Sequence, residues 1–179
     1  MLSKKDAFLV VVDVQEKLAR AMHDRDALIQ NTVKMVQGAG ILGLPILWTE
    51  QNPNGLGPTV PEVKELLAEY EPVTKLSFSC CGEERFKEKL DALNRKQALV
   101  LGIESHVCLY QTVVDLIDSG YEVQVLADAV SSRTPANMAI GLERCKLAGA
   151  SITSTETALF EILQKAEGDD FKQMLKVVK

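Results

Sequence analysis

Residue types that bind metals or form disulfides are scarce in this sequence. It has two histidines and four cysteines, and no two cysteines form a CxxC pair. These residues are His23, His106, Cys80, Cys81, Cys108 and Cys145. Because zinc sites are built from close Cys and His spacings, we expect no metal site and no cofactor. Cys80 and Cys81 are adjacent and cannot easily bridge each other. We expect four free thiols in a reducing, cytoplasmic compartment.

Long apolar runs are also missing. The longest is Ala7–Val12, whereas a membrane-spanning helix needs about 20 apolar residues. The opening MLSKKDAFLVVVDV has two lysines and an apolar stretch. An aspartate interrupts that stretch early and no small-residue cleavage site follows, so we expect no signal peptide. The sequence therefore predicts no membrane partner.

The charge balance excludes a further class of partner. Lys and Arg number 20, Asp and Glu number 25, and the net charge is −5. A nucleic-acid binder would need a basic patch, so we expect no nucleic-acid partner. The 179 residues, 46% of them apolar, suit one domain over 1–179 with a buried core.

Apolar, β-rich runs alternate with amphipathic stretches along the whole chain. We predict strands over 7–14, 45–50, 73–77, 97–103, 122–127 and 151–153, separated by helices over 24–42, 62–69, 83–93, 105–119, 135–149 and 156–166. This alternation predicts an α/β fold, in which helices cover both faces of a parallel sheet. Ligands of such folds bind beyond the carboxyl ends of the strands.

The segment Gly38-Ala-Gly-Ile-Leu-Gly43 matches the GxGxxG pattern of dinucleotide-binding proteins. That pattern needs a strand before it and a helix after it. Here the predicted order is reversed, so we interpret it as a glycine-rich helix end that packs closely on a strand.

Three predicted strand ends carry residues suited to nucleophilic catalysis. Asp13 closes a run of valines, and a buried carboxylate is costly unless it is paired or functional. Lys75 could pair with Asp13 and lower the pKa of a nearby thiol. Cys108 falls where a strand turns into a helix, with Ser105 as a plausible N-cap, so the helix N-terminus would favour a thiolate and could hold an oxyanion. The alternatives are a solvated strand end, a solvated lysine and an inert buried cysteine.

Five segments of the chain resemble one family. They are VVDVQ (11–15), TEQNPNGLGPT (49–59), TKLSFS (74–79), GIESHVCLYQT (102–112) and GYEVQVLADAVSSR (120–133). In order and spacing they resemble the isochorismatase-like cysteine hydrolases, and within that family the isochorismatase-domain proteins without assigned substrate. The resemblance covers nearly the whole chain.

The resemblance implies a fold and a catalytic triad. The fold is a three-layer α-β-α, Rossmann-like arrangement with a six-stranded parallel sheet. Asp13 would be the general base, Cys108 the nucleophile and Lys75 the cation between them. A cis peptide is implied at Ile103–Glu104, with the N–H groups of Glu104 and Cys108 as an oxyanion hole. Family members are commonly oligomeric, so we expect a homo-oligomer, either a dimer or a tetramer.

Two departures narrow the reaction. Nicotinamidases of this family bind a metal through an Asp and two His after the second strand, where this chain has EQNPNGLG (50–57) without histidine. True isochorismatases cleave a vinyl ether with the aspartate and do not need the cysteine. We therefore expect a metal-independent hydrolase of an amide or similar C–N bond of a small molecule. A catalytically silent scaffold and a vinyl-ether hydrolase are the alternatives.

Residues next to the triad in sequence are candidates for the substrate pocket, with ordinary core or rim packing as the alternative for each. They are Gln15, Leu18, Trp48, Phe78 and Tyr110. His106 lies two residues from Cys108, a spacing that does not place both on one helix face. For Asp128 and Arg133 we expect a salt-bridged loop, and Glu104 would face the pocket entrance or a neighbouring subunit.

Overall fold

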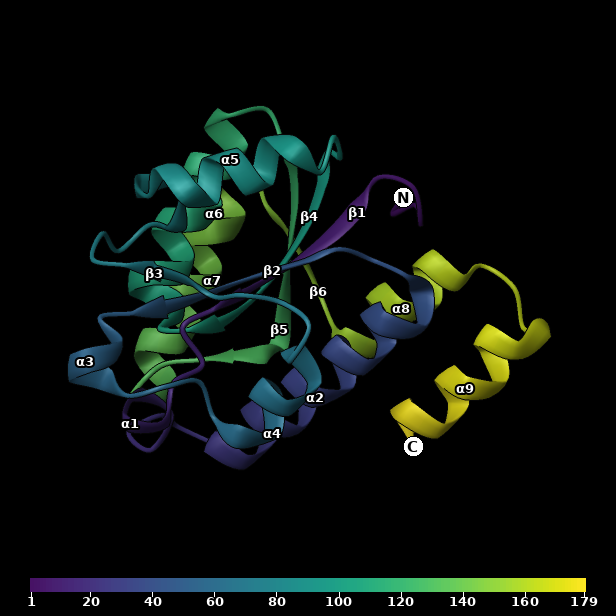
Figure 1. The fold of residues 1–179 in the computed structure, drawn as a ribbon, viewed down its shortest axis with the longest axis horizontal. Coiled ribbons are helices and arrows are strands. Elements are labelled where there is room, and N and C mark those ends of the chain that lie inside the picture. The colour runs from purple at the N-terminus through teal and green to yellow at the C-terminus, as the bar shows by residue number, and fades with distance from the viewer.

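The computed structural model describes residues 1–179 and contains one six-stranded sheet (Figure 1). All neighbouring strands are parallel, in the order β3-β2-β1-β4-β5-β6. The strands are β1 (Ala7–Val12), β2 (Ile46–Gln51), β3 (Val73–Lys75), β4 (Gln97–Ile103), β5 (Glu122–Ser131) and β6 (Ser151–Thr153). The predicted three-layer α/β fold with a six-stranded parallel sheet is confirmed.

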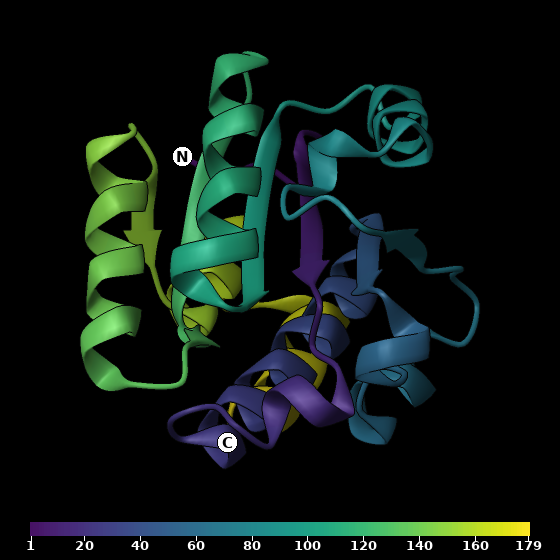
Figure 2. The same cartoon turned by 90° about the vertical axis from the view of Figure 1, so that its left-hand side faces the viewer.

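Helices cover the two faces of the sheet (Figure 2). They are α1 (Glu16–Ala19), α2 (Arg25–Leu42), α3 (Pro53–Leu56), α4 (Pro61–Lys64), α5 (Glu84–Ala92), α6 (Tyr110–Asp118), α7 (Pro135–Leu147), α8 (Thr155–Leu163) and α9 (Gly168–Val178). Because side chains alternate along a strand, β1 supplies both cores. Leu9 and Val11 pack towards α2 and α8, whereas Val10 and Val12 pack towards α5 and α6.

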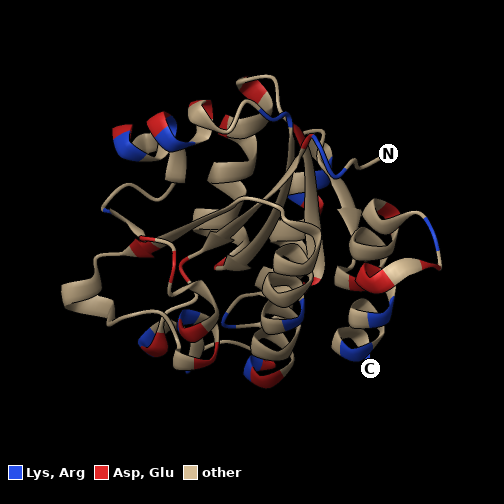
Figure 3. Cartoon of the chain, turned by 45° about the vertical axis from the view of Figure 1, so that its right-hand side comes forward, with Lys and Arg blue, Asp and Glu red and all other residues tan.

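Charged residues lie mainly on the outer helices and loops, where Lys and Arg alternate with Asp and Glu (Figure 3). None of the helices combines the length and the apolar character that crossing a membrane requires.

Several predicted elements differ from the observed ones in their bounds or type. The helix expected over 105–119 begins as a π-helical turn, Ser105–Leu109, and becomes α-helical only at Tyr110. β5 extends to Ser131 because its pairing with β4 shifts register between Val100 and Gly102. The C-terminal segment, which lies beyond the last predicted helix (156–166), forms the 11-residue α9.

The GxGxxG segment ends a helix, as expected, but packs differently. Gly38 lies inside α2, and a Cβ there would sit 2.4 Å from a methyl carbon of Leu159 in α8. Gly43 ends the helix with a φ of 64°, a conformation that favours glycine. The close approach at this end of the helix is therefore made by Gly38 to α8, whereas a Cβ at Gly40 or Gly43 would meet nothing within 4 Å.

Gly102 brings the two central strands together at their carboxyl ends. Its φ is +122°, and a Cβ would lie 2.0 Å from the carbonyl oxygen of Val12. The strand order reverses between β1 and β4, which is where ligands of open α/β sheets bind. The close approach thus places the residues after β1 beside the residues after β4.

Candidate active site

The carboxyl ends of β1, β3 and β4 bring the three predicted catalytic residues into one region. Asp13 follows β1 with a φ of 52°, Lys75 ends β3, and Cys108 lies in the turn after β4. The side chains of Asp13 and Lys75 are completely buried, and Cys108 is 6% exposed. The site is therefore a desolvated one, in which charges interact strongly.

Asp13 and Lys75 form a buried ion pair. Lys75 Nζ lies 2.6 Å from Asp13 Oδ2, and Thr49 Oγ1 donates to Asp13 Oδ1 at 2.7 Å. The remaining acceptors of the ammonium group are Gln51 Oε1 at 2.7 Å, the Phe78 carbonyl at 2.9 Å and the Ser77 carbonyl at 3.2 Å. The cation is thus held in place from several sides. Asp13 Oδ2 has no hydrogen-bond donor besides this ion pair.

Burial dominates the acid–base behaviour of the site. It raises the pKa of Asp13, and the charge of Lys75 and the hydrogen bond from Thr49 offset this only in part. For Lys75, burial acts to lower the pKa, but Asp13 and the nearby sulfurs of Cys80 and Cys108 outweigh it, so the pKa is raised. Burial and the Asp13 charge raise the pKa of Cys108 to about 12, against the opposing effect of Lys75. Burial thus acts against the expected thiolate, because it raises the pKa of Cys108 where a helix N-terminus and Lys75 were expected to lower it.

The turn that carries Cys108 has an unusual backbone. The Ile103–Glu104 peptide bond is cis, at the position that the family resemblance implies. The Glu104 carbonyl accepts from the N–H groups of Val107 and Leu109, while the N–H of Glu104 itself donates to no group of the protein. That N–H is one of the two predicted oxyanion-hole donors.

The same turn is cross-linked to the turn after β5. Ser105 Oγ lies 2.7 Å from Ser132 Oγ, and His106 Nδ1 lies 3.0 Å from the same hydroxyl. Glu104 Oε2 accepts from Arg133 Nε at 3.0 Å. The N-cap expected at Ser105 is wrong, because the N-cap position is occupied by Glu104 and the hydroxyl binds across to the β5 turn.

Asp128 and Arg133 do not form the expected salt-bridged loop together. Asp128 Oδ1 accepts from the N–H and the hydroxyl of Thr155, at the start of α8. Arg133 pairs with Glu104 instead. Its guanidinium group thereby comes next to the turn that carries Cys108.

The five predicted pocket residues occupy different environments. Trp48 is 3% exposed in the core beneath α2, and strand alternation points it away from Thr49 and the triad, so its assignment to the pocket is wrong. Gln15 uses its amide to bind the backbone of the loop after β2, and Leu18 packs against the α2 core. Phe78 is 55% exposed beside Lys75, and Tyr110 stacks under a guanidinium group of α7.

The loop after β2 is fastened to the chain that follows β1. The Gln15 amide donates to the carbonyls of Gln51 and Gly57 at 2.9 and 2.7 Å, and its oxygen accepts from the N–H of Gln51 at 2.8 Å. Glu50 Oε1 accepts from the N–H and the hydroxyl of Thr59. Nowhere in the chain do three or more His, Cys, Asp or Glu side chains gather closely enough to hold a metal ion.

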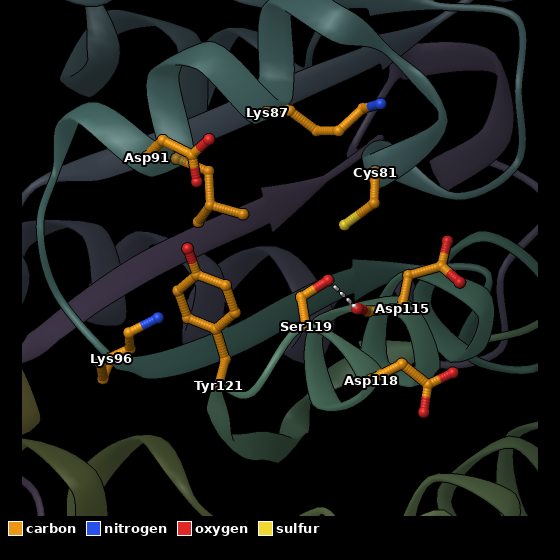
Figure 4. Close-up of a pocket in the computed structure, with 9 residues that line it drawn as sticks. Cys81, Lys87, Asp91, Lys96, Asp115, Asp118, Ser119 and Tyr121 are labelled. Carbon is orange, nitrogen blue, oxygen red and sulfur yellow. Dashed lines mark hydrogen bonds between the residues drawn. The ribbon is translucent and has the colours of Figure 1, made fainter.

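The adjacent cysteines point to different places. Cys80 is fully buried, and its sulfur lies 3.6 Å from Thr49 Oγ1, next to the Asp13–Lys75 pair. Cys81 lines a separate cavity of about 470 Å³ between α5 and α6, where Lys96 stacks on Tyr121 (Figure 4). The carboxylates around that cavity are Asp91, Asp115 and Asp118. Only Cys80 therefore belongs to the region of the triad.

The residues that support the triad were not found from the sequence. Thr49, Gln51 and Thr112 all hydrogen-bond to catalytic candidates or to their neighbours. Thr49 and Gln51 lie in β2, the strand between those that end near Asp13 and Lys75. Their position in the sequence could therefore have indicated polar partners for the two charged side chains. Thr112 lies four residues after Cys108, the spacing at which a helical threonine can bond back to a carbonyl, but that spacing alone does not single it out from an ordinary helix residue.

The fold and this site define a Rossmann-like α/β protein with a buried Asp–Lys–Cys group at the point where the strand order reverses. The family model for the isochorismatase domain matches residues 7–157. The chain therefore belongs to the isochorismatase-domain family and has its hydrolase fold. Isochorismatase domain-containing protein 2 of Xenopus laevis is 36% identical over 179 residues, which is 99% of this chain and 85% of that protein.

Solved structures agree with this assignment. The MAR1 ribonuclease from Caenorhabditis elegans is 34% identical, with a TM-score of 0.93 over 99% of this chain and 91% of its own. YcaC from Pseudomonas aeruginosa, solved with covalent acrylamide, is 25% identical with a TM-score of 0.93 over 98% and 90%. YcaC from Escherichia coli, an octameric hydrolase of unknown specificity, has the same fold at 23% identity, with a TM-score of 0.93 over 98% and 88%.

Proposed function

We propose that the protein is a cysteine hydrolase that cleaves an amide or similar C–N bond of a small molecule through a thioester, without a metal ion. The observation that carries the proposal is the fully buried Asp13–Lys75 ion pair next to the thiol of Cys108. A carboxylate with a raised pKa is suited to take a proton near neutral pH and to return it later. A nucleophile, a base and an orienting cation are what acyl transfer requires.

In the first half of the reaction, Cys108 Sγ forms a bond to the carbonyl carbon as its proton passes to Asp13. Because the pKa of the thiol is about 12, proton transfer has to accompany the attack. The free N–H of Glu104, together with that of Cys108, stabilises the oxyanion. Asp13 then donates the proton to the nitrogen, the C–N bond breaks, and ammonia or an amine leaves the thioester behind.

In the second half, Asp13 takes a proton from water as the water oxygen attacks the thioester carbon. The C–S bond breaks, and the proton held by Asp13 returns to the sulfur. Lys75 stays protonated throughout, because its raised pKa keeps the cation next to the carboxylate. Its role is to hold Asp13 in place and to limit the cost of the buried negative charge.

Burial of the triad favours a small substrate over RNA. One relative of known structure is a ribonuclease, but here Asp13 and Lys75 are completely buried and the net charge is −5. A phosphodiester backbone attracts basic surfaces and would have to reach a nucleophile that is 6% exposed. Hydrolysis of a structured RNA that Cys108→Ala abolishes would contradict this choice of substrate.

Vinyl-ether cleavage is the second candidate, because the raised pKa of Asp13 also suits a general acid. In that reaction Asp13 would be essential and Cys108 dispensable. A panel of small amides and vinyl ethers therefore separates the two. Under our proposal Cys108→Ala and Asp13→Asn both abolish turnover of the amide that is cleaved, while a Cys108→Ala variant with full activity would eliminate the thioester.

The experiment that tests the proposal directly is alkylation by limiting iodoacetamide between pH 5 and 9, mapped by peptide mass spectrometry. We expect Cys108 to react at a rate that rises as Asp13 ionises and then levels off, because Asp13 and not hydroxide removes the proton. Cys81 is the internal control: its pKa is raised to about 11 by burial and by Asp115, so its rate should rise with pH throughout the range.

The variant Asp13→Asn removes the base and leaves the thiol. We expect it to slow Cys108 alkylation on the plateau by about 100-fold, the usual contribution of general base catalysis, with no change at Cys81. If Cys108 in the native protein shows the same pH dependence as Cys81, the thiol is not activated by Asp13 and the proposal fails.

The proposal extends to assembly and location. We propose a homo-oligomer, a dimer or a tetramer, in the cytoplasm. YcaC from Escherichia coli is an octamer, and α7 exposes the apolar side chains of Ile140 and Leu147 by 52% and 78%. Sedimentation at the mass of one 19.6 kDa chain would contradict the assembly.

A further inference from the structure

We infer that Cys80 is a positioning residue of this site, which aims the Thr49 hydroxyl at Asp13 and couples the base to the turn of the nucleophile. The inference deepens the proposed function and rests on it. It follows from two hydrogen-bond chains that meet at Cys80, one through its thiol and one through its backbone N–H.

The first chain leads to the base. Thr49 Oγ1 lies 2.7 Å from Asp13 Oδ1 and 3.6 Å from Cys80 Sγ. A hydroxyl has one proton to donate, and an ionised carboxylate can only accept. The Thr49 proton therefore goes to Asp13, and the Cys80 thiol has to donate to the Thr49 oxygen. The order S–H to O–H to carboxylate is thus fixed by the number of protons.

The second chain leads to the nucleophile. The backbone N–H of Cys80 donates to Thr112 Oγ1 at 2.9 Å, and the Thr112 hydroxyl donates to the Cys108 carbonyl at 2.8 Å. Each link is buried. Cys80 therefore connects the carboxylate after β1 with the peptide that carries Cys108.

Cys80 is placed to position groups and not to react. It is completely buried, and burial together with the charge of Asp13 raises its pKa to about 12. The chemical consequence lies at Asp13, because a hydroxyl that accepts a hydrogen bond becomes a stronger donor. The donor from Thr49 lowers the pKa of Asp13. The titratable groups that face Asp13 are Lys75 from β3, Cys108 from the turn after β4 and Cys80 itself.

Loss of the thiol should therefore weaken the Thr49–Asp13 bond and move the ionisation of Asp13 to higher pH. In Cys80→Ala we expect Cys108 alkylation to slow by about two- to tenfold at pH 6, the equivalent of one hydrogen bond. The half-point of the alkylation rate should also shift upward in pH. Cys80→Ser keeps a donor at the same place and should restore both values towards those of the native protein.

Cys145 provides a matched control. It is also completely buried, lies in the same hydrophobic core as Cys80, and has a pKa raised to about 12 by burial alone. Cys145→Ala thus removes a sulfur atom from the same core without removing a hydrogen bond to a group of the triad. We expect it to lower stability as Cys80→Ala does, but to leave the half-point of Cys108 alkylation unchanged.

The outcomes separate this inference from the proposed function. Equal half-points in Cys80→Ala, Cys145→Ala and the native protein would overturn the role of Cys80. A shift that Cys80→Ser does not reverse would also overturn it, because packing alone would then explain the change. If the native protein shows no Asp13-dependent alkylation of Cys108 at all, the proposed function itself fails.

Discussion

Replacing Lys75 by Met tests whether the buried ion pair organises the site. Methionine keeps an unbranched side chain of similar length and removes the charge. Asp13 then remains fully buried with Thr49 as its hydrogen-bond donor and no cation at 2.6 Å. Three further acceptors lose their donor: Gln51 Oε1 and the carbonyls of Ser77 and Phe78.

The cost should be large, because breaking a buried pair leaves an uncompensated charge. Such changes destabilise proteins by about 3–5 kcal/mol, which is a substantial part of the roughly 5–15 kcal/mol that stabilises a typical domain. For a chain of this size, 1 kcal/mol corresponds to about 2–4 °C in Tm. We therefore expect Tm of Lys75→Met to fall by about 6–20 °C at neutral pH.

The free energy of unfolding of Lys75→Met should also depend on pH, in a direction that follows from the pKa of Asp13. Without Lys75 the folded-state pKa of Asp13, already raised by burial, rises further, so the folded state keeps a proton that the unfolded state releases near pH 3.9. The free energy of unfolding of Lys75→Met should therefore fall as the pH rises, by up to about 1.4 kcal/mol per pH unit, until the folded carboxyl ionises. The native protein has the same direction of shift at Asp13 but a weaker one, because Lys75 opposes it. The raised pKa of Lys75 adds stability that is fully present below the ordinary lysine pKa and is lost as the pH rises through the folded-state pKa.

Urea unfolding between pH 5 and 8 measures this, and Trp48 is a convenient probe as the single, buried tryptophan. The double variant Asp13→Asn with Lys75→Met removes both charges. It should recover part of the lost stability and lose the pH slope of the single variant. If Lys75→Met costs less than about 1 kcal/mol, the value of an exposed pair, and its slope equals that of the native protein, the ion pair does not have the energetic role argued here.

Two glycines that position the site give further predictions. Gly102→Ala forces a Cβ to within 2.0 Å of the Val12 carbonyl at a φ of +122°, so it should destabilise the protein by more than about 3 kcal/mol. Gly40→Ala is the control: its Cβ would meet nothing within 4 Å, and it should raise stability by up to about 1 kcal/mol. Urea unfolding compares the two, and equal values would contradict the close approach of β1 and β4. Gly141→Ala would place a Cβ within 2.7 Å of backbone atoms in the turn that carries Cys108. Because the turn would have to move, Cys108 alkylation should slow by about tenfold or more. An unchanged alkylation rate would show that the turn tolerates the displacement.

The fold was predictable because its signals are local. The run that became β1 is apolar at every position, as a strand buried on both faces must be, and strands 97–103 and 151–153 were predicted with their observed bounds. The extension of β5 to Ser131 was not predictable, because it depends on a register shift against β4. The π-helical turn was missed for a similar reason: its cross-links to Ser132 and Arg133 join residues far apart in the chain.

The candidate site was predictable in its residues and not in its electrostatics. Asp13, Lys75 and Cys108 stand at strand ends, and the family resemblance assigns them roles. Whether Lys75 or burial controls the thiol depends on the exposure of each group, which the sequence does not report. The same limit applies to Trp48, whose place on the α2 face follows from the register of β2 relative to β1.

Burial of the triad disfavours a free thiolate at rest but strengthens the interactions that would stabilise charge during the proposed reaction. A thiol with a pKa of about 12 is therefore compatible with the proposed mechanism. A thiolate formed in advance would place a second negative charge near Asp13 with only Lys75 to balance both. Keeping the proton on sulfur leaves a single buried ion pair at rest, which costs less. In the proposed reaction the negative charge moves from Asp13 to the substrate oxygen as the proton moves to Asp13, so the number of charges is conserved. Under the proposed mechanism such a site depends on an oxyanion hole more than on an acidic thiol. The N–H of Glu104, which has no acceptor in the protein, is the group we propose for that role.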